Sequence, residues 1–123
     1  MNWRAAIRAA LMLGILAWPP AYAQPPASVQ VEVGFLLGYI DGSGCEFYRN
    51  GTWHDSKAAQ QHLRDKYDYL AARNLIDTTE DFIDKAATKS SLSGQAYVVR
   101  CNGGAAVSSS KWLRDELVRL RTP

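Results

Sequence analysis

The fold is decided by one short stretch, Ser43-Gly44-Cys45-Glu46-Phe47-Tyr48-Arg49-Asn50-Gly51. Small residues open it, a mixture of apolar and polar residues fills it, and an Asn-Gly turn signal closes it, which is typical of a short strand. It carries one of the two cysteines of the chain. The second cysteine ends the partner strand that the sequence favours, Ala96-Tyr97-Val98-Val99-Arg100-Cys101. We expect the remaining segments to be helices packed on these two strands.

An antiparallel pairing with Cys45 opposite Cys101 sorts the side chains of both strands into two faces. One face becomes an apolar patch for helices to cover, made of Cys45, Phe47, Val99 and Cys101. The other face places Glu46 opposite Arg100, a favourable cross-strand pair of opposite charge. A slip of one residue would exchange the two faces. The pairing and the side-chain pattern therefore support each other.

The N-terminus has the layout of a secretory signal peptide, with Arg4 and Arg8 before an apolar core from Ala9 to Trp18 and the cleavage site Ala21-Tyr22-Ala23. The core is too short to cross a bilayer, which takes about 20 apolar residues. We expect a signal peptide over residues 1–23 and a single small exported domain over residues 24–123. The protein would then be periplasmic or secreted, with no membrane span after signal cleavage.

The charge of the expected mature domain is balanced. The chain has 14 Lys and Arg residues against 12 Asp and Glu residues, and removal of Arg4 and Arg8 leaves 12 of each sign. A basic footprint, which nucleic-acid binding requires, is absent. We expect no nucleic-acid partner, and instead an envelope ligand or protein whose identity is unknown.

Two cysteines in an exported chain favour one disulfide, Cys45–Cys101, because the compartment is oxidising. Closing a loop of about 57 residues contributes roughly 4 kcal/mol on the chain-entropy estimate. A thiolate metal pair and a redox dithiol are the alternatives, but the chain has no Cys-x-x-Cys. A zinc site needs three or four ligands, and the chain has two histidines. We expect no metal and no cofactor.

Helical periodicity covers most of the remaining sequence. The first helix is expected from Val29 to about Asp41 and the second from Ser56 to about Asn74, directly after the Asn-Gly turn and with no further strand. The expected N-caps of the four helices are Ser28, Asp55, Thr78 and Ser109 or Ser110. The predicted fold is therefore an α+β domain, predominantly helical, with about four helices packed on a two-stranded antiparallel ribbon and one disulfide.

The strand register also predicts a site, because it brings the Arg49-Asn50-Gly51 end of one strand beside Ser93-Gly94. The candidate ligand-binding residues are Arg49, Asn50, His54, His62, Ser91, Ser93 and Tyr97. Some of them have structural explanations as well: His54 precedes a helix N-terminus, and His62 precedes a core residue. Arg49 lies opposite Tyr97, where it would either stack on the ring or hold a carboxylate.

Three functions are compatible with this pattern. The favoured one is a non-catalytic periplasmic binding or envelope-associated module that uses a polar rim around Arg49-Asn50-Gly51. The second is a small envelope hydrolase with His54 or His62 as general base and a serine of the 90–93 loop as nucleophile, although the chain has no Gly-x-Ser-x-Gly. The third is a protein–protein inhibitor or stress protein that uses Trp53, Trp112 and the first helix. An enzyme is the less favoured class, and no catalytic residue is assigned.

A set of short motifs resembles the YfeK-like family of small exported bacterial proteins. They extend over most of the expected domain: Ser43-Gly44-Cys45, Phe47, Arg49-Asn50-Gly51, His54, His62-Leu63, Lys66-Tyr67, Thr79-Glu80-Asp81-Phe82-Ile83, Ser90-Ser91, Ser93-Gly94, Tyr97, Val99, Cys101 and Trp112-Leu113. The resemblance implies export and paired cysteines. It implies no activity, because the family is of unknown function and has no assigned catalytic residues.

Overall fold

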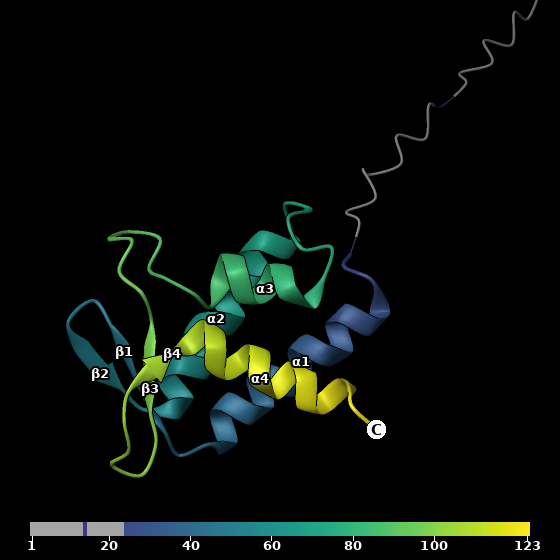
Figure 1. Ribbon diagram of the computed structural model, residues 1–123. Coiled ribbons are helices and arrows are strands. Elements are labelled where there is room, and N and C mark those ends of the chain that lie inside the picture. Colours follow the sequence, from purple (N-terminus) through teal and green to yellow (C-terminus); the bar gives the residue numbers. More distant parts are fainter. Residues whose placement is uncertain (1–13, 15–23) are drawn as a thin grey trace, which may run out of the picture.

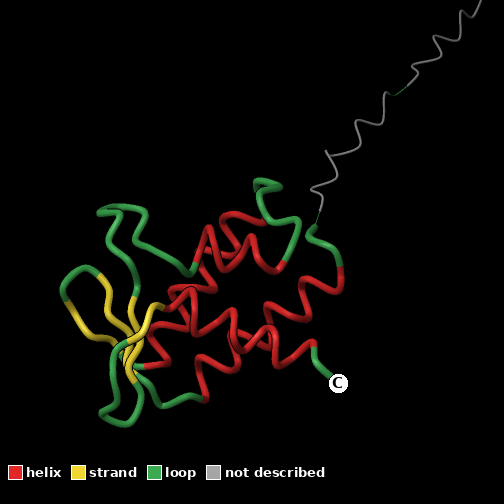
Figure 2. Tube along the Cα trace, in the orientation of Figure 1, coloured by secondary structure: helices red, strands yellow, loops and turns green. Residues whose placement is uncertain are grey.

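The computed structural model describes Gly14 and residues 24–123 (Figure 1). The elements are, in chain order, α1 (Ala27–Gly42), β1 (Glu46–Arg49), β2 (Thr52–His54), α2 (Ser56–Ala71), α3 (Thr79–Ala86), β3 (Val98–Arg100), β4 (Val107–Ser108) and α4 (Ser109–Arg121). The strands gather at one end of the helical part, and the C-terminus lies at the other end (Figures 1 and 2). The signal peptide predicted for residues 1–23 lies outside the described residues, Gly14 apart, and stays a prediction.

Helix α1 packs against α2, α3 and α4 and supplies five core residues, Val29, Val33, Leu36, Leu37 and Ile40. It begins at Ala27, so the predicted start with Ser28 as N-cap was wrong. The cap is Pro26, whose carbonyl accepts the N–H groups of Val29 at 2.9 Å and Gln30 at 3.1 Å. Because proline has no N–H to satisfy and a restricted φ, it lets the helix start before the first serine.

The other helices begin at short polar side chains. The Asp55 carboxylate caps α2 by accepting the N–H of Ala58 at 2.8 Å, as predicted. Thr78 and Asp81 form a reciprocal capping box at the start of α3. Helix α4 is capped by Ser108, which accepts the N–H of Lys111 at 3.2 Å and lies one residue before Ser109, the nearer of the two predicted caps. Helix α2 ends at Ala71 instead of about Asn74.

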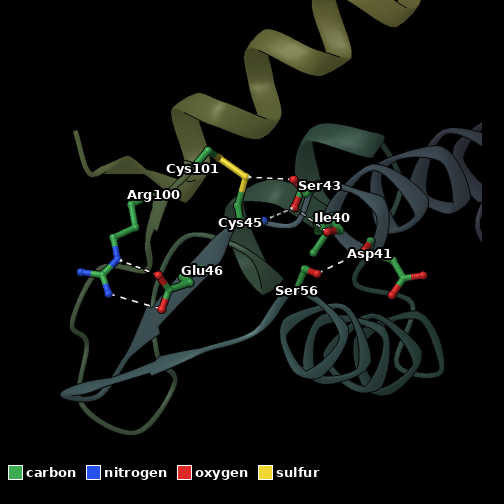
Figure 3. Close-up of a disulfide and its surroundings, with 8 residues drawn as sticks. All are labelled: Ile40, Asp41, Ser43, Cys45, Glu46, Ser56, Arg100 and Cys101. Carbon is green, nitrogen blue, oxygen red and sulfur yellow. Dashed lines mark hydrogen bonds and ion pairs between the residues drawn. A yellow bond between two sulfur atoms is a disulfide. The ribbon is translucent and has the colours of Figure 1, made fainter. Parts of the chain in front are cut away.

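Strands β1 and β3 pair antiparallel in the predicted register, with Glu46 opposite Arg100 and Phe47 opposite Val99. The disulfide between Cys45 and Cys101 joins their ends, with the two Cα atoms 4.4 Å apart (Figure 3). Beside it, the Arg100 guanidinium donates to both carboxylate oxygens of Glu46 at 3.2 and 3.3 Å (Figure 3). The predicted disulfide and the predicted cross-strand ion pair are thus both confirmed.

The sheet is wider than predicted, with four strands in the order β2-β1-β3-β4. The expectation that the Asn50-Gly51 turn leads straight into a helix was wrong, because β2 first pairs antiparallel with β1. Asn50 and Gly51 both have positive φ, 48° and 87°, as a two-residue hairpin turn of type I′ requires. β2 and β4 have three and two residues, too few for a periodic pattern to reveal them. The predominantly helical α+β class with one disulfide is confirmed.

The apolar core lies between the helices and the inner face of the sheet. Phe47 and Val99 from the sheet join α1 and residues of α3 and α4, namely Phe82, Ile83, Leu113 and Leu117. The Tyr97 ring is 6 % exposed and joins the same core just before β3. Among residues 24–123, no helix combines the length and the apolar character that a membrane span requires.

Candidate functional site

Two segments that are about 40 residues apart in sequence meet at Asn50, in the turn between β1 and β2. The Asn50 side chain donates its amide N–H to Ser90 Oγ at 3.1 Å and accepts the Ser93 hydroxyl at 2.5 Å. Ser90 is buried and also accepts the N–H groups of Leu92 and Ser93. The predicted convergence of the hairpin turn with this loop is therefore present, and Asn50 holds it together.

Below this junction, four side chains form a continuous chain of hydrogen bonds, the Arg49 cluster, made of Arg49, His62, Lys66 and Tyr97. Arg49 Nη1 lies 2.7 Å from His62 Nδ1, and His62 Nε2 lies 3.1 Å from the Tyr97 hydroxyl. Lys66 Nζ donates to the same hydroxyl at 3.2 Å and to the carbonyl of Lys89 at 3.1 Å. The cluster thus joins the end of β1, the middle of α2 and the segment before β3.

The positions of the protons in the Arg49 cluster follow from which of its side chains can only donate hydrogen bonds. Arginine has only N–H donors, so His62 Nδ1 must accept the bond from Arg49 and the ring proton must lie on Nε2. His62 Nε2 therefore donates to the Tyr97 oxygen, which also accepts the Lys66 ammonium. Both bonds end on the oxygen, so the Tyr97 O–H proton is free for a further acceptor.

The electrostatic setting keeps His62 uncharged. Burial, with the charges of Arg49 and Lys66 as further causes, lowers the pKa of His62 to about 4, while Asp65 opposes them. Burial also lowers the pKa of Lys66, with Arg49 as the second cause. Burial raises the pKa of the Tyr97 phenol, against the opposing effect of Arg49. At neutral pH the cluster therefore combines two cations, a neutral imidazole and a protonated phenol.

Arg49 and Lys66 differ from the other cations of the described chain. Seven ion pairs join Lys and Arg side chains to carboxylates there, and these two residues belong to none of them. Both are half-buried, whereas the other Lys and Arg residues without a carboxylate partner are exposed: Lys57, Arg64, Arg73 and Lys89. A half-buried cation normally has an anionic partner, because its desolvation is otherwise uncompensated.

A small cleft of about 50 Å³ opens on the Arg49 side of the cluster. Its polar lining comes from Arg49, His54, His62, Tyr97 and Ser109, and its apolar lining from Phe47, Tyr48, Ala58, Ala59 and Leu63. Roughly 10–15 Å³ of such space holds one water molecule, so the cleft has room for a few atoms of a ligand. Ser91 and Lys66 lie outside it, around a second hollow that shares His62.

Of the predicted site residues, Arg49, His54, His62 and Tyr97 line the cleft, Asn50 and Ser93 bond to each other at the hairpin turn, and Ser91 lies outside the cleft. The proposed stack of Arg49 on Tyr97 is replaced by the bond from Arg49 to His62, and the cation over the Tyr97 ring is Lys66, 5.0 Å from its centroid. Lys66 was absent from the predicted set. Its position four residues after His62 was the available signal, because residues i and i+4 share one face of a helix.

The geometry that a serine hydrolase requires is not assembled in residues 24–123. Ser93 donates to Asn50, and both ring nitrogens of His62 are engaged, by Arg49 and by Tyr97. No serine in this part of the chain is hydrogen-bonded to a histidine. Within the same residues, no group of three or more His, Cys, Asp or Glu side chains is placed to hold a metal ion.

The tryptophans of the third hypothesis are engaged within the fold. The Trp112 ring stacks on Tyr39 with centroids 4.5 Å apart and meets the edge of Phe47 at 5.5 Å. Trp53 packs edge-on against Tyr48 and under the Arg100 guanidinium. Their positions are explained by packing.

Comparison with known proteins supports the resemblance drawn from the motifs. The model of a family of unknown function, DUF5329, matches residues 27–121. The uncharacterized protein YfeK of Salmonella typhimurium (strain LT2) is 39% identical over 88 residues, which cover 72% of this chain and 69% of that protein. No solved structure matches the chain. The chain belongs to the DUF5329 family, a family of unknown function that includes proteins similar to YfeK.

Proposed function

We propose that this protein is a non-catalytic binding module of the cell envelope, exported by its signal peptide, and that the cleft beside Arg49 is its ligand site. The observation that carries the proposal is the pair of half-buried cations, Arg49 and Lys66, which have no carboxylate partner among the described residues. Of the other ten Lys and Arg residues in residues 24–123, six are paired with a carboxylate and the remaining four are exposed. A purely structural cluster would be more stable with an acid or an apolar residue in place of Arg49.

The rigidity of the rim supports binding. Asn50 ties the hairpin turn to the Ser90–Ser93 loop through two side-chain bonds, and Tyr97 is held by bonds from two residues of α2. A preformed site loses little conformational entropy when a ligand enters, which favours affinity. Asn50 and Ser93 thus support the rim, while Arg49, His54 and Tyr97 face the cleft.

The state of His62 favours binding over catalysis. A general base must have a free, basic nitrogen within reach of the proton it removes. The Nδ1 lone pair of His62 already accepts from Arg49, and the pKa of this histidine is lowered to about 4. His62 is therefore a positioning residue for Arg49 and Tyr97 in this proposal.

The binding proposal is tested by retention from a periplasmic extract. The wild-type protein, Arg49→Ala, His54→Ala and the control Arg64→Ala are immobilised, incubated with the extract and washed. The retained small molecules and proteins are then identified by mass spectrometry. Arg64 suits the control because it is an exposed cation of α2 without a carboxylate partner.

We expect at least one species that the wild type and Arg64→Ala retain and that Arg49→Ala and His54→Ala lose. An identical set of species on all four proteins would contradict the proposal. Circular dichroism shows that each variant is folded before the comparison is made. The export part is tested separately by N-terminal sequencing of the protein from the periplasmic fraction, which should begin at Gln24.

A further inference from the structure

The walls of the cleft restrict what it can hold. Its apolar lining includes the small side chains Ala58 and Ala59 from the first turn of α2, together with Leu63 and Phe47. Apolar walls favour an apolar group of the ligand, because burial removes its surface from water. The volume of about 50 Å³ limits that group to a few atoms.

The charge of the cleft restricts the polar group of the ligand. Arg49 is the one lysine or arginine among its lining residues in the described chain. Lys66 lies behind Tyr97, where its ammonium donates to the Tyr97 hydroxyl and to the Lys89 carbonyl. One guanidinium balances one negative charge. Inorganic phosphate carries between one and two negative charges at neutral pH, because its second pKa lies close to that pH.

The donors of the cleft match a carboxylate. One of the five N–H groups of Arg49 is donated to His62, and the others are available to a ligand. The Tyr97 O–H proton is also available, because its oxygen already accepts from His62 and Lys66. A planar guanidinium forms two parallel bonds with a carboxylate, and a neighbouring hydroxyl can donate to the same group.

We propose that the cleft binds a monocarboxylate whose neighbouring group is small and apolar, an inference that rests on the binding function proposed above. Two sources share this chemistry: a free short-chain carboxylic acid, and the C-terminus of a peptide that ends in a small apolar residue. Arg49 and Tyr97 hold the carboxylate, and Ala58, Ala59 and Leu63 surround the apolar group. His62 positions both donors.

The experiment is an NMR titration of the full protein with four probes. Propionate represents the free acid, N-acetylalanine represents a peptide C-terminus, propionamide is the uncharged match of propionate, and inorganic phosphate is the tetrahedral anion. The signals followed are the ring protons of His54 and His62 and the backbone amides of Arg49 and Ala58.

We expect saturable shifts with propionate or N-acetylalanine, and the tighter of the two identifies the source. Propionamide and phosphate should bind at least about tenfold more weakly, because charge-assisted hydrogen bonds to the guanidinium are lost or mismatched. The bound carboxylate should also raise the pKa of His62, because it offsets the positive charge of Arg49.

Variants separate the site from general charge effects. Arg49→Gln should weaken the binding of the carboxylate probe about tenfold or more, whereas Arg64→Gln should leave it unchanged. Arg49→Lys keeps the charge without the planar donors, so its affinity should lie between those of Arg49→Gln and the wild type.

Equal affinity for propionate and propionamide, tighter binding of phosphate, or the absence of a saturable shift with either carboxylate would overturn the monocarboxylate inference. The binding function would survive these results if retention from the extract still depended on Arg49 and His54. Conversely, carboxylate binding without such dependence would leave the inference standing and remove the proposed function.

Discussion

One end of strand β1 lies beside the disulfide Cys45–Cys101, and the other lies at the turn Asn50-Gly51. The arginine near each end has a different kind of partner. At the cysteine end, Arg100 is paired with Glu46 (Figure 3). Its guanidinium also packs over the Trp53 ring. At the turn end, Arg49 is half-buried and donates to a neutral histidine. Two arginines on neighbouring strands thus have different roles. The cysteine end is held by a disulfide and an ion pair, and the turn end carries the ligand site that we propose.

The largest expected effect is at the cysteine end. The double variant Cys45→Ser/Cys101→Ser should lose about 4 kcal/mol of unfolding free energy, because the unfolded chain is no longer closed into a loop between positions 56 apart. Denaturant unfolding under oxidising conditions measures the loss. Reduction of the wild type should reproduce it, and a loss below about 1 kcal/mol would show that this end is held by packing instead.

An intermediate effect is expected from His62 at the turn end. Its pKa is lowered from 6.5 to about 4 in the folded state, so between these values the unfolded chain binds more protons. The unfolding free energy should therefore fall as pH decreases from 6.5 towards 4. Burial is the largest cause of the shift, the charged groups that add to it are Arg49, Lys66 and His54, and Asp65 opposes them.

The measurement is denaturant unfolding at several pH values, with His62→Gln as comparison. The upper part of the window is the most informative, because above about pH 5.5 the carboxylates are largely ionised in both states. His62→Gln should flatten the curve there. A wild-type curve that is already flat between pH 6.5 and about 5.5 would mean that His62 titrates normally.

A small effect is expected from the paired arginine. Glu46→Gln removes the partner of Arg100, whose side chain is 37% exposed. Exposed ion pairs contribute less than about 1 kcal/mol, and salt screens them. The loss of stability should therefore be below about 1 kcal/mol and should shrink further in high salt, as measured by thermal or denaturant unfolding.

The smallest effect on stability is expected from Arg49→Gln. The variant loses one bond to His62 and also removes an unpaired, half-buried charge, so the two changes should largely cancel, to within about 0.5 kcal/mol. The same variant should strongly weaken ligand binding. A loss of several kcal/mol would assign Arg49 to the fold and would remove the contrast between the two ends of β1.

The register of β1 on β3 could be predicted because a strand alternates its side chains with a period of two, and one slip would move Phe47 and Val99 out of the core. The convergence of Asn50 with Ser93 followed from that register. Strands β2 and β4 were beyond prediction, because edge strands of two or three residues are stabilised by their neighbours and leave no pattern of their own. Pro26 was missed as a cap because the rule that favours serine outweighed it.

The sequence by itself determined the cysteine pairing, the faces of the central strands, the four helices and the place where distant polar residues meet. These properties depend on local periodicity and on the order of the segments, and both can be obtained from the sequence. Only the tertiary structure decided that Arg49 bonds to His62 instead of stacking on Tyr97, that Lys66 completes the cluster, and that no carboxylate in the described residues pairs with either cation. The partners of Arg49 and Lys66 depend on how α2 packs against the sheet. That packing results from the whole core and not from any one segment.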